Sequence, residues 1–268
     1  VLRASEKIAP RFLYYTVTNQ SFTDYLTANA KGAAYPAVDI DTIKRAEINL
    51  PPLPVQQKIA AILSAYDDLI ENNLRRIKIL EEMAQALYRE WFVHFRFPGH
   101  EKVRLVDSPL GKIPEGWEVR TVEEIFEIKG GGTPSKAVPE YWDGGIINWY
   151  VPSDLTASGT LFMDESSNKI TDVGLRKSSA QLFPAFSVMM TSRATLGVIS
   201  INTTEACTNQ GFITCNPNDK FPLYTLYHWL KENVDLFVSL GTGATFKEIT
   251  KGVFKTITII VPLLSVVE

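Results

Sequence analysis

Several loops predicted from the sequence hold hydroxyl, amide and cationic side chains of the kinds that contact DNA. Phosphate oxygens are bound by lysine, arginine, hydroxyl and backbone N–H groups, and base edges are bound by amides and arginine. Lys136, Arg193 and Lys247 are the strongest candidates for such contacts. The full candidate set is Lys129, Thr133, Ser135, Lys136, Ser192, Arg193, Asn209, Gln210, Thr242, Thr245 and Lys247.

Purely structural roles remain open for some residues of these loops. Asn209 could cap a turn rather than reach a ligand. Glycines suit tight turns, and tryptophans pack in cores more often than they face a ligand. These alternatives apply to Gly131, Gly132, Gly197, Gly211, Trp117, Trp142 and Trp149. Tyr141 and Tyr150 could stack on a ligand or pack near the loops.

A search for a catalytic site yields none. His94, His100 and His228 lack partners at metal-ligand spacing. Residues 241–247 superficially resemble a phosphate loop, but the Gly-Lys-Ser/Thr ending is missing. We find neither a methyltransferase motif nor an acidic nuclease cluster. The sequence therefore predicts a protein that is not an enzyme and needs no cofactor or metal.

The composition is that of a globular protein with more than one core. The chain has 268 residues, 45% of them hydrophobic, and a formal net charge of -3, so overall charge gives no sign of nucleic-acid binding. Cys207 and Cys215 lack metal spacing, and no apolar run approaches the length of a bilayer span. We expect a soluble, cytoplasmic protein without a membrane partner.

The element that must position these loops is the stretch 54–92, which predicts one long helix. Glycine is absent from it, and Pro51 and Pro52 precede it. Apolar residues recur every seven positions in two series, which is typical of a coiled-coil seam that needs a helical partner. The predicted interface is Ile59, Leu63, Tyr66, Ile70, Asn73, Ile77, Leu80, Ala84, Leu87 and Trp91. A helix lying along its own domain is the alternative.

The rest of the chain predicts shorter elements. Helical patterns cover 7–29 and 221–240, and 104–114 is a turn-rich connector. Alternation and β-branched residues predict strands at 46–50, 124–129, 146–151, 187–191, 197–201, 211–215 and 256–261.

An internal repeat appears when the sequence is shifted by 211 residues. Residues 32–35 then fall on 243–246, and residues 48–51 fall on 259–262, without a gap. The order of helix, glycine loop, strand and proline is the same in both copies. The repeat predicts that two parts of the chain share one fold.

Six segments in this order resemble the specificity subunit of type I restriction-modification systems: 50–59 (LPPLPVQQKI), 113–118 (IPEGWE), 131–135 (GGTPS), 192–197 (SRATLG), 208–212 (TNQGF) and 241–247 (GTGATFK). The resemblance implies an α+β protein in which a β-rich target-recognition domain with peripheral helices is attached to a long coiled-coil spacer helix. It also implies recognition of one half of a bipartite site in double-stranded DNA. Methylation and restriction subunits would be the partners that supply catalysis.

In those terms, we expect the following division: 1–50 as the C-terminal part of a first recognition domain, 54–92 as the spacer helix, 93–114 as a connector, 115–262 as the second recognition domain and 263–268 as the start of a second spacer region. Both ends look incomplete beside the family's plan. A homodimer through the spacer helix is a further expectation. The alternative is a truncated coiled-coil assembly protein that has lost DNA recognition.

Overall fold

The computed structural model describes residues 2–32, 36–243 and 247–267. The chain divides into two compact units, residues 1–83 (unit 1) and 84–268 (unit 2), which are described separately below. Thr245 and the repeat positions 33–35 and 244–246 lie outside the described residues.

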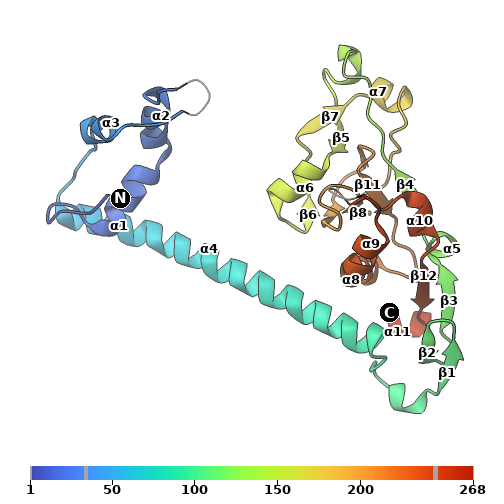
Figure 1. The fold of residues 1–268 in the computed structure, drawn as a ribbon. Coiled ribbons are helices and arrows are strands. Elements are labelled where there is room, and N and C mark those ends of the chain that lie inside the picture. Colours follow the sequence, from blue (N-terminus) through green and yellow to red (C-terminus); the bar gives the residue numbers. More distant parts are fainter. Residues whose placement is uncertain (1, 33–35, 244–246, 268) are drawn as a thin grey trace. The chain divides into compact units, whose positions relative to one another are not determined.

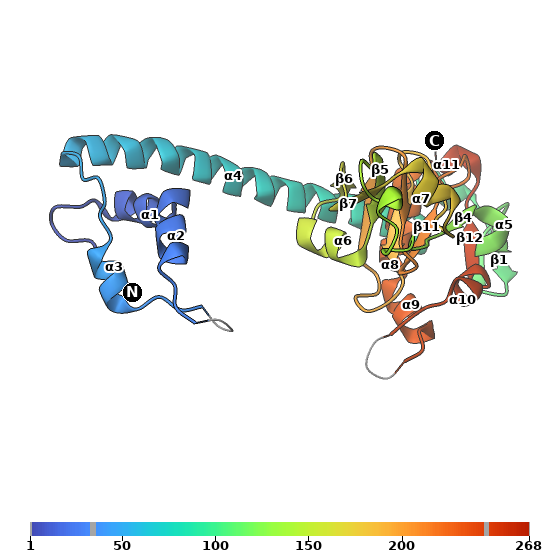
Figure 2. The same cartoon turned by 90° about the horizontal axis from the view of Figure 1, so that it is seen from above.

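Unit 1 contains three short helices and the first part of a long one (Figure 1). The expected helix over 7–29 is two helices, because Asn19 ends one and caps the next, accepting a hydrogen bond from the Phe22 N–H at 2.8 Å. Ile8 and Phe12 pack on Ala60 to form a small core, and Figure 2 shows α1 running beside the start of the long helix. The helices are α1 (Pro10–Thr18), α2 (Gln20–Ala28), α3 (Ile40–Arg45) and α4 (Leu53–Tyr88).

Helix α4 confirms the predicted long helix, and it continues into a π-helical turn at Arg89–Val93. Gln56 anchors its start in unit 1. The buried Gln56 amide accepts from the Ala9 N–H at 2.9 Å and donates to the carbonyl oxygens of Lys7 and Pro51 at 3.1 and 2.7 Å. A buried amide with all these groups satisfied fixes the path of the preceding chain.

The seam of α4 has no helical partner within the described residues, so the coiled coil is not confirmed. Its large apolar residues from Ile59 to Leu87 are between 36% and 64% exposed. Trp91 differs from the expectation for the seam. It is partly buried in an aromatic cluster of unit 2 with Phe97, Ile113 and Trp117, because the π-helical turn changes the direction of its side chain relative to a regular helix.

Unit 2 mixes sheets with peripheral helices. A five-stranded sheet has the order β4-β11-β8-β9-β6, and a three-stranded sheet has the order β10-β5-β7. The strands of these two sheets are β4 (Ile128–Gly130), β5 (Ile147–Tyr150), β6 (Phe162–Met163), β7 (Asn168–Ile170), β8 (Val188–Thr191), β9 (Ile199–Asn202), β10 (Ala206–Thr208) and β11 (Phe212–Cys215).

Two further strand pairs complete unit 2. The connector forms a hairpin of β1 (Leu105–Ser108) and β2 (Gly111–Pro114), and β3 (Glu118–Thr121) pairs antiparallel with β12 (Thr258–Val261). The shorter helical elements are α5 (Val122–Ile125), α6 (Pro152–Ser158), α7 (Asp172–Arg176), α10 (Lys251–Lys255), α11 (Leu264–Val267) and the 3-10 turns His100–Lys102 and Pro139–Tyr141.

The predicted helical stretch 221–240 is confirmed as α8 (Leu223–Glu232) and α9 (Val234–Leu240), separated at Asn233. Their apolar faces pack on the five-stranded sheet. Leu226, Leu230 and Phe237 are fully buried in one core with Val188 and Ile213. The loops between these strands and helices therefore project from a packed framework.

Two strand predictions are wrong. Segment 124–129 holds the end of α5 and the start of β4, because the Glu124 carboxylate caps the helix by accepting from the Thr121 N–H at 2.6 Å. Segment 46–50 has no regular structure. Its repeat counterpart β12 pairs with β3, whereas segment 46–50 pairs with no other strand among the described residues.

The backbone carries the predicted repeat. An isolated antiparallel bridge joins Lys31 to Ala37 in unit 1, and an equivalent bridge joins Thr242 to Glu248 in unit 2 at the same shift of 211. The helix that follows is capped in the same way in both copies. The Asp39 and Thr250 side chains each accept from the N–H three residues later.

Candidate nucleic-acid interface

A run of three glycines brings the loop after β4 against the loop after β10. A Cβ atom on Gly131 would lie 1.7 Å from the Asn209 carbonyl oxygen, and one on Gly132 would lie 2.2 Å from Ser179 Oγ. The Gly132 N–H also donates to the Thr208 carbonyl at 2.9 Å. Glycine is required because the backbones approach too closely for any side chain.

Polar side chains join the same two loops. The Thr133 hydroxyl donates to the Gln210 side-chain oxygen at 2.7 Å. Asn209 has the structural role that the sequence left open, since its side-chain oxygen accepts from the Gly211 N–H at 2.8 Å in a tight turn. Thr133 and Gln210 are thus brought together, with the Gln210 side chain exposed.

The loop between β8 and β9 lies beside these two. The Ser192 N–H donates to the Gly211 carbonyl at 2.8 Å, and a Cβ on Gly211 would lie 3.2 Å from Arg193 Nε. Ala194 follows in a left-handed conformation with φ of 61°. Such a conformation is uncommon for alanine, which indicates a loop held by its surroundings.

The loop after α9 joins the group. The Ile249 N–H donates to the Ser192 carbonyl at 3.0 Å, and an isolated bridge connects Arg193 with Glu248. The Lys247 ammonium reaches the Gly241 carbonyl at 3.3 Å, and Thr242 is exposed nearby in the chain. Segments 131–136, 192–194, 208–211, 242–243 and 247–248 therefore meet at one part of unit 2, which we call the loop cluster.

Three candidates differ in setting from the others. Ser192 is 3% exposed, so only its backbone serves the loop cluster. Lys129 is paired with Glu127, and this hydrogen-bonded ammonium lowers the pKa of the Glu127 carboxyl. The Ser135 backbone carbonyl accepts a hydrogen bond from the Trp142 indole N–H at 3.0 Å. The side chains of Ser135 and Lys136 are both exposed.

Lys251 belongs with the loop cluster but was missed from the sequence. Its ammonium lies directly over the Gly130 backbone, at the position that a side chain would fill. The only sequence signal was a cation at the first position of a short helix. The matching residue in the first repeat is Ile40, so the repeat itself gave no indication.

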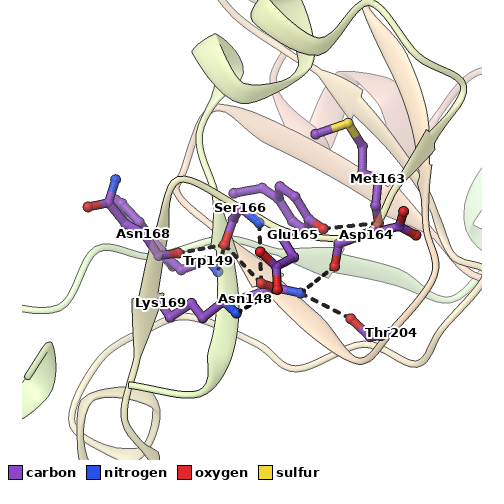
Figure 3. A network of polar contacts seen from close by, with 10 residues as sticks. Asn148, Trp149, Met163, Asp164, Glu165, Ser166, Asn168, Lys169 and Thr204 are labelled. Carbon is purple, nitrogen blue, oxygen red and sulfur yellow. Dashed lines mark hydrogen bonds and ion pairs between the residues drawn. The ribbon is translucent and has the colours of Figure 1, made fainter. Parts of the chain in front are cut away.

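A polar network supports the loop cluster from β5 (Figure 3). The buried Asn148 side chain donates to the Asp164 carbonyl and to Thr204 Oγ1, both at 3.0 Å, and accepts from the Ser166 N–H at 3.2 Å. The adjacent Trp149 indole N–H donates to the Gly132 carbonyl at 2.8 Å. These bonds fix the position of β5 and, through Trp149, that of the glycine run. Trp149 is buried, so it has the core role that the sequence left open as an alternative to ligand contact.

The two cysteines, Cys207 and Cys215, are buried in the interior of unit 2. Burial raises the pKa of both Cys207 and Cys215 to about 12, so the thiols stay protonated at neutral pH and are poor nucleophiles. Within residues 2–32, 36–243 and 247–267, no three His, Cys, Asp or Glu side chains are grouped as a metal site would require. No described helix combines the length and apolarity that crossing a membrane demands.

Comparison with known proteins identifies the family. The family model of the type I restriction modification DNA specificity domain matches residues 1–82 and 114–266. The chain belongs to this family. The specificity-domain relatives include the MjaIX specificity subunit of Methanocaldococcus jannaschii, 32% identical over 58% of this chain and 36% of that protein. The HindI specificity subunit of Haemophilus influenzae is 24% identical over 95% of this chain and 68% of the relative.

A solved structure supports the fold of this specificity-domain protein. The S subunit of a type I restriction-modification system from M. genitalium has a TM-score of 0.56 at 16% identity, over 97% of this chain and 63% of that one. The likeness concerns the fold alone. The chain spans about a third of the length of the MjaIX subunit and less than two thirds of the M. genitalium subunit.

Proposed function

We propose that the chain is a non-catalytic specificity component that binds one half of a bipartite site in double-stranded DNA through the loop cluster. The observation that carries this proposal is the meeting of four loops, far apart in sequence, that present Lys136, Arg193, Gln210 and Lys247. Membership of the specificity-domain family supports it.

Different members of the loop cluster have different tasks in this proposal. The cations Lys136, Arg193, Lys247 and Lys251 contact phosphates or base edges, and Gln210 offers an amide whose orientation Thr133 fixes. Ser135 and Thr242 supply exposed hydroxyl groups, while Lys129, Ser192 and Asn209 hold strands and loops in place.

The division expected from the sequence is part of the proposal. Residues 1–50 belong to a first recognition domain, 54–92 form the spacer helix, 93–114 connect, 115–262 form the second recognition domain and 263–268 begin a second spacer region. The spacer helix docks methylation subunits, which supply methyl transfer, and a restriction subunit supplies cleavage. The exposed apolar residues of α4 support this docking, since such a surface is stable when covered by another protein.

The same helix supports self-association into a homodimer through the seam that starts at Ile59. Beyond the two predicted series, Ile62, Leu69, Leu74 and Met83 are more than half exposed. The apolar surface of α4 is therefore wider than one coiled-coil seam. A helix of this kind can pack against more than one partner helix at a time.

The experiment that tests DNA binding is a fluorescence-anisotropy titration of labelled duplexes at several salt concentrations. Phosphate neutralisation releases counterions, so the logarithm of the association constant should fall linearly with the logarithm of salt concentration. No measurable binding at low salt, for a pool of duplexes of random sequence, would contradict the proposal.

A further inference from the structure

Residues 178–181 lie against the glycine run although they belong to none of the segments of the loop cluster. A Cβ atom on Gly132 would overlap the backbone of Ser179 and Ala180. At the other end of the run, the Gly130 N–H donates to Gln181 Oε1 at 2.7 Å. The glycine run therefore joins the 178–181 segment to the loop cluster.

Packing and hydrogen bonds hold the 178–181 segment in place. Ala180 is 8% exposed and packs in one core with Trp149, and its N–H donates to Ser178 Oγ at 3.3 Å. Just after the segment, the Phe183 N–H donates to the Ala206 carbonyl of β10 at 2.9 Å. A side chain carried by such a backbone starts from a fixed position, as a binding group requires.

The side-chain amide of Gln181 has a defined orientation. Only the oxygen of an amide can accept a backbone N–H, so Oε1 is the atom that contacts Gly130. Gln181 is exposed, and its Nε2 has no hydrogen-bond partner in the part of the chain that the structure describes. The residue therefore offers two free N–H donors to a ligand.

The Lys251 ammonium lies next to the same amide. A Cβ atom on Gly130 would overlap Lys251 Nζ and would lie 3.7 Å from Gln181 Oε1. The Lys251 and Gln181 side chains are both exposed. An ammonium group beside amide donors suits a ligand that presents a phosphate and a hydrogen-bond acceptor together, as a nucleotide does.

The contact with Gly130 limits the base edges that Gln181 can recognise. In the major groove, a free glutamine amide recognises adenine by donating to N7 and accepting from the N6 amino group. The Gln181 oxygen is already engaged, so donation remains. Guanine offers the acceptors O6 and N7 and thymine offers O4, whereas cytosine presents an amino donor.

We propose that Gln181 is a specificity-determining residue that selects guanine or thymine at one position of the DNA site, and that Lys251 binds the backbone phosphate beside it. This inference rests on the proposed DNA binding by the loop cluster. It adds a reading residue outside that cluster and the class of base that this residue reads.

Selection from a pool of random duplexes tests this inference. Duplexes bound by the complete chain and by its Gln181→Glu variant are recovered and sequenced. The substituted carboxylate can still accept from the Gly130 N–H, but it has no amino group to donate. We expect the unmodified chain to enrich guanine or thymine at one position. In the variant, this preference should fall about tenfold, toward adenine or cytosine, whose amino groups a carboxylate accepts.

Two further variants separate base reading from charge. Asn168→Asp makes the same exchange of amide for carboxylate at an exposed residue of β7 outside the loop cluster, and it should keep every base preference. Lys251→Ala should weaken binding to all sequences and lower the salt slope by about 1, with the preference at the Gln181 position unchanged.

The outcomes distinguish this inference from DNA binding itself. Bound duplexes with the same base preferences for Gln181→Glu and the unmodified chain would overturn the role of Gln181 and leave DNA binding intact. Enrichment of adenine or cytosine by the unmodified chain, at the position that changes in the variant, would also overturn it. No recovery of duplexes by any of the four proteins at low salt would overturn DNA binding and the role of Gln181 together.

Discussion

Three consecutive glycines at 130–132 show how single residues hold the loop cluster together. Gly131 and Gly132 face backbone atoms of Asn209 and Ser179 at distances that exclude a side chain, whereas Gly130 faces the mobile end of the Lys251 side chain. None of them has a left-handed backbone. Close approach rather than turn geometry therefore explains this glycine run, which the sequence suggested only as a turn.

Replacement of Gly131 by alanine should lower the free energy of unfolding of unit 2 by about 1–3 kcal/mol, because the added methyl group overlaps the Asn209 carbonyl. Gly252→Ala is the matched control, since its Cβ would meet only Thr250 Oγ1 at 3.8 Å. Urea unfolding followed by tryptophan fluorescence measures both variants. Equal midpoints for G131A and the unmodified protein would contradict the close approach.

His228 should make unit 2 less stable in acid. Burial, and then the Lys231 ammonium, lower the pKa of this imidazole, whose Nδ1 lies 2.7 Å from the Gln85 side-chain oxygen. The unfolded chain takes up the proton near pH 6.5 and the folded chain resists it, so stability is full above that pH and is lost as the pH falls below it. His228→Asn should lose less stability between pH 7.5 and 5.5. Parallel losses in urea unfolding would refute this role.

Substitutions in helix α4 test the proposed self-association of the chain. Replacing Leu63, Ile70 and Ile77 by aspartate should abolish self-association, because charges would enter the proposed seam. Aspartates at Ala61, Ala65 and Asn72 add the same charge on another face and should leave association intact. Light scattering at rising concentration measures both triple variants. A monomer at every concentration of the unmodified chain would contradict association through α4.

Sequence periodicity predicted well the elements that are stabilised by their own residues or by packing within the chain. Helix α4 and strand β11 follow their hydrophobic patterns closely. Segment 124–129 was misassigned although Thr121 and Glu124 carry a capping signature, because the apolar residues 125, 126 and 128 suggested a strand. Segment 46–50 has a strand pattern and no strand, since pairing depends on a partner that pattern alone does not reveal.

At the scale of the whole molecule, we propose that unit 2 binds DNA and that α4 docks the partner subunits. The sequence named most cations of the loop cluster, since residue type indicates the chemistry. It could not separate exposed groups from those used internally, such as Ser192 and Asn209, because that depends on tertiary contacts. Lys251 was missed for the same reason.

Duplex binding by charge variants tests the central claim most directly. The variant K136A/R193A/K247A removes three cations of the loop cluster, and K58A/K102A/K112A removes three exposed cations elsewhere. In anisotropy titrations across salt concentrations, each lost phosphate contact should reduce the salt slope by about 1. We expect weaker binding and a shallower slope for the first variant and little change for the second. Equal affinities and slopes for the two variants would contradict it.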